Sequence, residues 1–190
     1  MSVQSILTNL VLRWQFKNGS KGPLNVGAAR HKVDKLAERY PAPPKDITHT
    51  PLAANPAKGL SPAEWLSVAQ PKRMVLYFHG GGWVLGDYPT HARLIRDLVV
   101  NSGAVAVYVG YTPSPEAQYP TAIDQAYAAT RWVGEHGKEI QVDSSRLAVA
   151  GNSVGGNMAA VVALKAKEAG TPKLSFQLLL WPVTDANLET

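Results

Sequence analysis

Hydrophobic positions in the first 40 residues repeat at helical spacing. Apolar side chains recur every three or four positions between Val3 and Trp14, which predicts an amphipathic helix over residues 2–16. A stretch rich in Asn, Gly and Pro at residues 18–23 breaks this pattern. A second helix is predicted from Val26 to Tyr40, and three prolines just beyond it end helical structure.

From residue 45 onward, short apolar runs alternate with amphipathic segments. Strands are predicted at residues 46–50, 64–68, 73–78, 104–109, 146–150 and 174–180. Helices are predicted at residues 91–101, with Thr90 as the cap, at 120–134 and at 154–169. Strands that are apolar at consecutive positions and alternate with helices indicate a mostly parallel sheet covered on both faces. The sequence therefore predicts a doubly wound α/β domain preceded by a helical segment.

Composition fits a soluble globular domain and narrows the chemistry. The 190 residues are 45% hydrophobic and 17% charged, and they contain no cysteine. A thiol nucleophile, a disulfide framework and a thiolate metal site are therefore excluded. No apolar run is long enough to span a bilayer, and the N-terminus lacks the basic start and small-residue cleavage site of a signal peptide. We expect a cytoplasmic location.

The net charge of +5 lies entirely in residues 1–50, which hold eight Lys and Arg residues against three acids. A basic end of this kind can bind nucleic acid or anionic lipid. Here it has neither interleaved aromatic residues nor a nucleic-acid motif. We therefore expect a solvated helical face, no nucleic-acid partner and no stable membrane insertion.

Candidate chemistry begins at Ser153, inside the segment Gly151-Asn152-Ser153-Val154-Gly155. This G-x-S-x-G pattern lies where a predicted strand ends and a helix begins, which is the context that a nucleophilic serine turn requires. Glycines two residues on either side allow a turn too tight for larger side chains, and the helix N-terminus favours developing negative charge. The alternative is a phosphate-binding turn, but the segment lacks a lysine and a G-x-G-x-x-G pattern.

A second glycine cluster, His79-Gly80-Gly81-Gly82-Trp83, follows the predicted strand at 73–78. Three consecutive glycines after a buried strand are costly unless the backbone must approach a ligand closely. We expect the amides of Gly81, Gly82 and Val154 to form an oxyanion hole; a flexible turn is the alternative. In hydrolases with such a serine turn the general base follows the serine in the chain, so His79 is predicted to anchor the loop instead.

These segments, together with Tyr111–Glu116 and Trp181-Pro182-Val183-Thr184-Asp185, resemble the hormone-sensitive-lipase-like esterases, also known as bacterial family IV. The resemblance covers residues 70–185. It implies an α/β-hydrolase fold with about six of its eight strands present, an N-terminal helical cap over residues 1–44 and a core over residues 45–190 that is incomplete at its C-terminus. It also implies hydrolysis of short- to medium-chain carboxylic esters without a cofactor or metal, and it leaves a homodimer open.

Two positions depart from the family pattern. Asn152 stands where the family has Asp, and the segment 110–116 lacks the Asp and the Arg of the family's Asp-Tyr-Arg-Leu-Ala-Pro-Glu motif while keeping its Glu as Glu116. Either change alters the hydrogen bonding near the serine without removing a reacting group. Glu116 is open to two interpretations, a buried acceptor near the turn or a surface carboxylate. Trp83 is equally open, as a substrate-pocket residue or as a core aromatic.

The family places its catalytic Asp and His after two further strands, whereas no histidine follows Ser153 in this sequence. Asp185 matches the end of the sixth strand rather than the catalytic acid. We therefore expect the 190 residues to be a shortened or interrupted product that is nearly inactive alone, because loss of the triad His costs about 2 × 10⁶ in kcat in a serine protease. A ligand-binding protein is the alternative, since plant gibberellin receptors resemble the same family and also lack the His.

Overall fold

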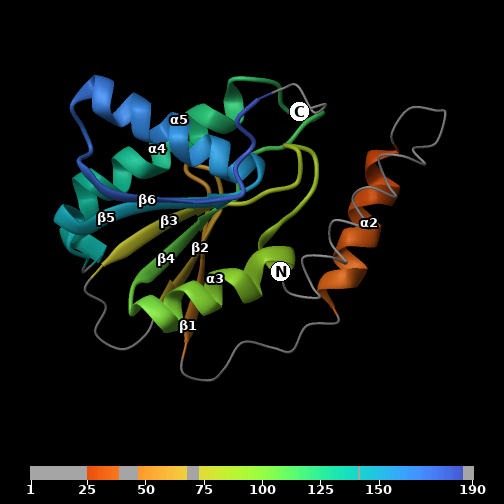
Figure 1. The fold of residues 1–190 in the computed structure, drawn as a ribbon, viewed down its shortest axis with the longest axis horizontal. Coiled ribbons are helices and arrows are strands. Elements are labelled where there is room, and N and C mark those ends of the chain that lie inside the picture. The colour runs from red at the N-terminus through yellow and green to blue at the C-terminus, as the bar shows by residue number, and fades with distance from the viewer. Residues whose placement is uncertain (1–24, 39–46, 68–72, 141, 186–190) are drawn as a thin grey trace.

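The computed structural model describes residues 25–38, 47–67, 73–140 and 142–185. These residues form one six-stranded sheet with helices on both faces (Figure 1). The doubly wound α/β architecture predicted from the sequence is therefore confirmed. The helix predicted at residues 2–16 lies outside the described residues, and the division into a cap over 1–44 and a core over 45–190 stays a prediction.

The sheet has the strand order β1-β2-β4-β3-β5-β6. The strands are β1 (Thr48–Leu52), β2 (Ala63–Ser67), β3 (Met74–Phe78), β4 (Val105–Val109), β5 (Leu147–Asn152) and β6 (Leu174–Leu180). Strands β4, β3, β5 and β6 run parallel, whereas β2 pairs antiparallel with both β1 and β4. Antiparallel neighbours can be joined by a short connection, and the short 3₁₀ turn η1 (Pro56–Lys58) lies between β1 and β2.

Helices cover the sheet unequally. On one face lies α3 (Tyr88–Ser102), and on the other lie α4 (Thr121–His136) and α5 (Val154–Ala169) (Figure 1). Helix α2 (Val26–Ala37) stands apart from the sheet and contacts α3. Two further 3₁₀ turns, η2 (Gly137–Ile140) and η3 (Ser144–Arg146), connect α4 to β5.

The start of α3 differs from the prediction. The N-cap is Asp87 rather than Thr90, so the helix begins three residues earlier than predicted. The Asp87 carboxylate accepts a hydrogen bond from the Thr90 amide at 3.0 Å, and the Thr90 hydroxyl accepts one from the Asp87 amide at 2.9 Å. Thr90 is therefore the third helical residue of a reciprocal capping box, and Pro89 is tolerated because it falls in the first turn.

The central strands are buried on both faces because helices cover both. All five residues of β4 are buried, as are four of the five residues of β3. At the end of the sheet, β6 is an edge strand and Phe176 is 63% exposed. The rigid centre fixes the points from which the loops after β3 and β5 depart.

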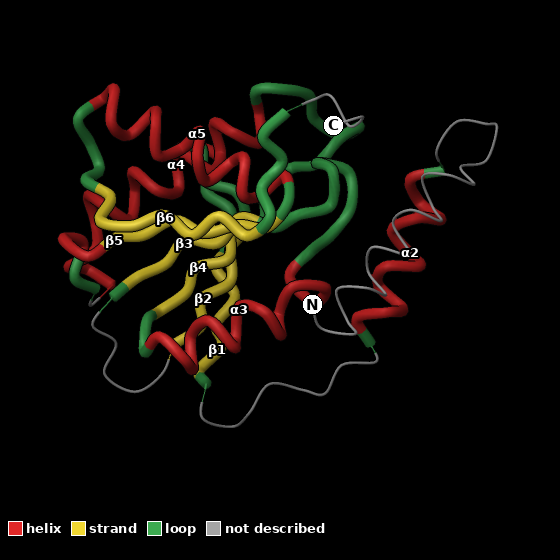
Figure 2. Tube along the Cα trace, viewed as in Figure 1, coloured by secondary structure: helices red, strands yellow, loops and turns green. Residues whose placement is uncertain are grey.

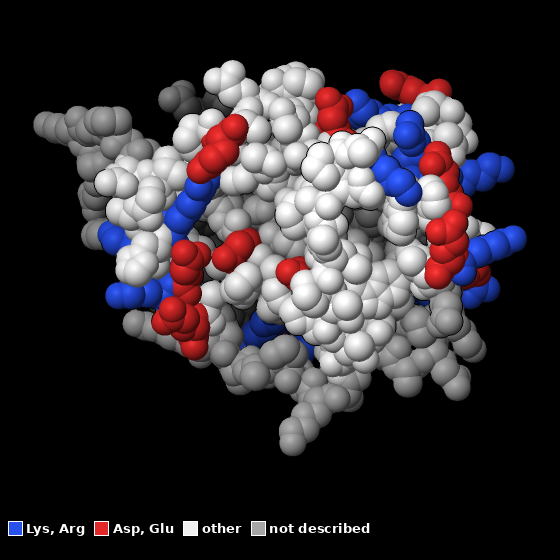
Figure 3. Space-filling view, turned by 180° about the vertical axis from the view of Figure 1, so that it is seen from behind, with Lys and Arg blue, Asp and Glu red and all other residues white. Residues whose placement is uncertain are grey.

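Charged side chains on the rear of the molecule gather mainly at its flanks and leave a broad uncharged centre (Figure 3). Within the described ranges, no helix combines the length and the apolar character needed to cross a membrane.

Candidate active site

The Ser153 turn and the His79–Trp83 loop lie beside each other at one end of the sheet. Strands β3 and β5 are hydrogen-bonded parallel neighbours, and their register pairs Phe78 with Gly151. The segments that follow therefore leave the sheet at the same carboxyl end, where the loops gather in Figure 2. Open α/β sheets bind their ligands at such ends.

Ser153 occupies the single position between β5 and α5, with φ 54° and ψ −123°. A residue with a side chain is strained in this conformation by about 1–3 kcal/mol. The surrounding main chain holds it there. The Ser153 amide donates to the carbonyl of Leu180 at 3.0 Å, and the Ser153 carbonyl accepts from the amides of Gly156 and Val183 at 3.0 and 3.1 Å.

The glycines of this turn are required by close backbone contacts. A β-carbon at Gly151 would lie 2.2 Å from the carbonyl oxygen of Gly155. One at Gly155 would lie 2.0 Å from the carbonyl oxygen of Phe78. Neither neighbour is a flexible side chain, so helix α5 can begin this close to β3 only if both positions are glycine.

Relief of this strain is measurable as stability. We expect Ser153→Gly to have a free energy of unfolding about 1 kcal/mol higher than Ser153→Ala. Both variants lose the hydroxyl, but only glycine adopts the positive φ freely, and that gain exceeds the cost of a more flexible unfolded chain. Urea denaturation of the two variants measures the difference. Equal midpoints and slopes would show that the turn is not strained.

The first amides of α5, at the positive end of the helix dipole, lie next to Ser153 in the chain. Val154 is the first helical residue, and the leading N–H groups of a helix have no partner within it. Their partial positive charge favours an anion at this end. The Val154 amide, adjacent to Ser153 in the chain, is therefore available to an oxyanion.

The glycine loop folds into a tight turn after β3. Gly81 and Gly82 have φ 126° and 66°, and the Gly81 carbonyl accepts from the amides of Val84 and Leu85 at 3.1 and 2.8 Å. A β-carbon at Gly81 would meet the Leu85 carbonyl oxygen at 1.9 Å. Among the described residues, no acceptor is hydrogen-bonded to the amides of Gly81 or Gly82. The turn therefore leaves two N–H groups available.

Asn152 joins the serine turn to the glycine loop. Its side-chain oxygen accepts from the Gly80 amide at 2.9 Å and from the Tyr77 hydroxyl at 2.7 Å. A β-carbon at Gly80 would lie 2.7 Å from the Asn152 amide nitrogen, so the two segments touch. Asparagine retains the oxygen that an aspartate would offer here, and it does so without a charge.

His79 is buried beneath the glycine loop, with 2% of its surface exposed. Its ring stacks on Tyr111 with centroids 4.2 Å apart, and its Nδ1 donates to the Gly80 carbonyl at 2.8 Å. Burial, together with the neighbouring His91, lowers the pKa of His79 to about 3. His79 is therefore neutral at pH 7, with one ring nitrogen committed to the loop.

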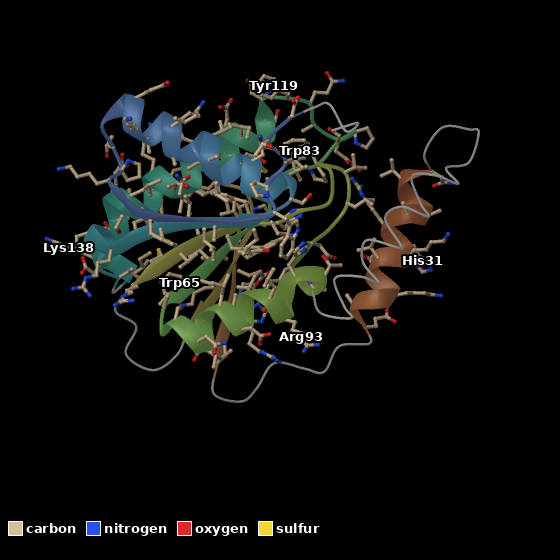
Figure 4. The ribbon with its side chains drawn as sticks, in the orientation of Figure 1. His31, Trp65, Trp83, Arg93, Tyr119 and Lys138 are labelled. Carbon is tan, nitrogen blue, oxygen red and sulfur yellow. The ribbon has the colours of Figure 1, made fainter. Side chains whose placement is uncertain are left out.

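Of the other four histidines, His91 lies beside His79, with ring centroids 5.4 Å apart. His31 is exposed on α2, well apart from Trp83 in Figure 4. His49 bonds a carboxylate of β2, His91 bonds the main chain at the start of α3, and His136 bonds the carbonyl one turn before it in α4. Within the described part of the chain, no histidine is hydrogen-bonded to Ser153.

Glu116 is a surface carboxylate, and its interpretation as a buried acceptor near the serine is wrong. Its side chain is 51% exposed and forms a bidentate ion pair with Arg30 at 2.7 and 2.9 Å. The hydrogen bond from Arg30 lowers the pKa of Glu116 to about 2. The expectation of a solvated basic face does not hold for Arg30, because its partner lies 86 positions away and no local pattern connects the two residues.

Trp83 is partly buried and packs against the core cluster between the sheet and helices α4 and α5. It lies on the same side of the molecule as Tyr119 (Figure 4), with φ 58°, and its carbonyl accepts from the Ser114 amide at 2.7 Å. Two hollows of about 500 and 710 Å³ open beside β2 and β6, and Trp83 lines neither. Its core contacts are therefore observed, and its role in a substrate pocket stays a prediction.

The chemistry available at this edge is that of a hydroxyl beside free amides. Across the described ranges, no group of three His, Cys, Asp or Glu side chains is arranged to hold a metal ion. Ser153 is a candidate nucleophile, and the nearby N–H groups are candidate donors to a developing negative charge.

Comparisons with known proteins agree with this fold. Residues 75–190 match a family described as alpha/beta hydrolase fold. Esterase LipI of Mycobacterium tuberculosis is 51% identical over 111 residues, which are 58% of this chain and 35% of LipI. The ethyl acetate hydrolase of Pseudomonas putida is 40% identical over 116 residues, which are 60% of this chain and 36% of that enzyme.

A solved structure extends the similarity beyond the matched segment. The crystal structure of a thermostable esterase from Pseudomonas putida superposes with a TM-score of 0.79 and 57% sequence identity, over 92% of this chain and 56% of that one. The chain therefore spans little more than half the length of that esterase, and the aligned segments cover about a third of the two sequence relatives.

Proposed function

Because the chain belongs to the α/β-hydrolase-fold family, we propose that this edge of the sheet is the acyl-transfer site of a serine carboxylesterase. One observation carries the proposal: the strained Ser153 turn is joined through Asn152 to a loop whose Gly81 and Gly82 amides have no acceptor among the described residues. Free N–H groups beside a nucleophile are the requirement for an oxyanion hole.

The proposed reaction proceeds in two steps. The Ser153 Oγ attacks the ester carbonyl carbon, and the amides of Gly81, Gly82 and Val154 stabilise the negative oxygen of the tetrahedral intermediate. The carbon–alkoxy bond then breaks, the alcohol leaves with a proton, and the acyl group stays on Ser153. Water displaces the acyl group in the second step and regenerates the serine.

Each step needs a general base, which the described geometry does not supply at Ser153. His79 is neutral but buried, and its Nδ1 donates a hydrogen bond to the Gly80 carbonyl. We therefore assign it, with Asn152, to supporting the glycine loop. The base and its orienting acid are proposed to come from polypeptide outside these 190 residues, so this chain alone is proposed to be nearly inactive.

The proposed substrates are carboxylic esters of short to medium acyl length. Two relatives are named as ester hydrolases, the esterase LipI and the ethyl acetate hydrolase, and the second name specifies a short acyl ester. Helix α2 belongs to the proposed cap over residues 1–44, and it is bonded through Arg30 to the loops near the site. Trp83 is proposed to line the acyl pocket with the face that the core leaves uncovered.

A fluorophosphonate probe tests the proposal with imidazole added as a replacement base. Ser153 Oγ bonds to phosphorus, fluoride leaves, and imidazole takes the hydroxyl proton. We expect peptide mass spectrometry to find an imidazole-dependent adduct on Ser153 that is absent from Ser153→Ala. No adduct at any imidazole concentration would contradict the esterase site and favour a ligand-binding protein. Rapid labelling without imidazole would contradict the proposal that this chain supplies no general base to Ser153.

A further inference from the structure

Arg30 is the residue that connects helix α2 to the loops at the candidate site. Its Nε donates to the Val84 carbonyl at 2.9 Å and its Nη2 donates to the Ser114 carbonyl at 3.0 Å. The same guanidinium forms the bidentate ion pair with Glu116. One side chain thus joins three segments that are distant in sequence, on the side of the molecule where α2 stands in Figure 1.

Both carbonyls belong to the structure that shapes the glycine loop. The Val84 amide is hydrogen-bonded to the Gly81 carbonyl, so Val84 is part of the turn that displays the Gly81 and Gly82 amides. The Ser114 amide donates to the Trp83 carbonyl at 2.7 Å, which connects the second segment to the same turn. Arg30 therefore holds the turn from two sides.

The carbonyl contacts, rather than the ion pair, are the specific part of this arrangement. Glu116 is about half exposed, and exposed ion pairs contribute little. In the described part of the chain, no other donor is hydrogen-bonded to the carbonyl of Val84 or Ser114. A planar guanidinium can serve both carbonyls and a carboxylate at once, which a lysine ammonium cannot do in this geometry.

We propose that Arg30 is a positioning residue that fixes the turn Gly81–Leu85 and thereby the oxyanion-hole amides. This inference rests on the proposed function for its catalytic consequence, but the fixing of the turn stands without it. Through Arg30, the helical N-terminal segment controls the rate of acyl transfer rather than the affinity for substrate.

Hydrogen exchange of the peptide spanning residues 79–86 tests the fixing of the turn. We expect Arg30→Met to speed exchange of the Val84 and Leu85 amides by about tenfold, the effect of losing a hydrogen bond from a charged donor. Exchange in Arg30→Lys should be nearly as fast as in Arg30→Met, because lysine keeps the charge but lacks the planar guanidinium. The matched control is Arg131→Met, which removes an exposed arginine–glutamate pair on α4 and should leave this peptide unchanged.

Swapping the charges of residues 30 and 116 separates the effect of the ion pair from that of the carbonyl contacts. In the double variant Arg30→Glu with Glu116→Arg, an ion pair can form again, but a glutamate at position 30 cannot donate to either carbonyl. We expect exchange of the 79–86 peptide to stay fast in this variant. Slow hydrogen exchange of this peptide, either in the double variant or in Arg30→Met, would overturn the proposal.

Phosphonylation of Ser153 in saturating imidazole gives the functional readout. We expect Arg30→Met to lower the limiting rate about tenfold, with the half-saturating probe concentration unchanged. A change confined to the half-saturating concentration would overturn the positioning role. If the unmodified chain forms no adduct while the exchange results are as expected, the esterase proposal fails and the fixing of the turn by Arg30 stands.

Discussion

The 190-residue chain is expected to hydrolyse p-nitrophenyl acetate about 10⁶ times more slowly than a serine esterase whose histidine is in place. The reason is the position of its five histidines. None that the structure describes is hydrogen-bonded to Ser153, and the nearby His79 is neutral, buried and bonded to the Gly80 carbonyl. A serine hydroxyl without a base is a weak nucleophile.

Substitution of the serine provides the control for this result. Serine and histidine act as one unit, so removing the serine when the base is already missing should change the rate little. We expect Ser153→Ala to hydrolyse the ester within a few-fold of the unmodified chain. Steady-state release of p-nitrophenol measures both rates, with an imidazole-free buffer. Rapid hydrolysis that Ser153→Ala abolishes would show that a base lies within the chain.

Gly155→Ala is expected to lower the free energy of unfolding by about 3 kcal/mol or more, because the added β-carbon would lie 2.0 Å from the Phe78 carbonyl oxygen. The contact is between α5 and β3 main chain, so no side chain can rotate to relieve it. Either α5 shifts outward or the serine turn opens. Urea denaturation followed by circular dichroism measures the loss, and the soluble yield reports a variant that fails to fold.

Gly27→Ala is the matched control for this prediction. Gly27 also lies in the first turn of a helix, but a β-carbon there would be 3.6 Å from the nearest atom outside its neighbours, at ordinary contact distance. Alanine favours the helix by about 0.5–1 kcal/mol at an unhindered position. We expect Gly27→Ala to be neutral or stabilising. Equal stability of the two variants would contradict the close approach of α5 to β3.

The sequence predicts the helices and strands more fully than it predicts the contacts among them. All six strands predicted from the apolar runs are present, each within two residues of its predicted limits, and α5 has the predicted bounds. The start of α3 was missed because Asp87 and Thr90 are both good caps, and only the hydrogen bonds distinguish them. The antiparallel orientation of β2 was missed because an apolar run carries no direction.

The candidate site shows the same division. The glycines around Ser153 and in the loop after β3 identify both turns, because positive φ and close backbone contact are demands made within a few residues. Burial of His79 between tyrosine rings, which keeps it neutral, depends on side chains that no local pattern brings together. The same holds for the two hydrogen bonds of Asn152.

The sequence by itself determined the alternation of strands and helices, the two glycine turns and the absence of any histidine after Ser153. Hydrophobic period and backbone conformation are set by neighbouring residues, so they can be recognised from the chain alone. Only the tertiary structure decided that Asn152 joins the two turns and that Arg30 reaches Val84, Ser114 and Glu116. Such contacts depend on strand register and on the docking of α2, which together bring residues from distant parts of the chain within hydrogen-bond distance.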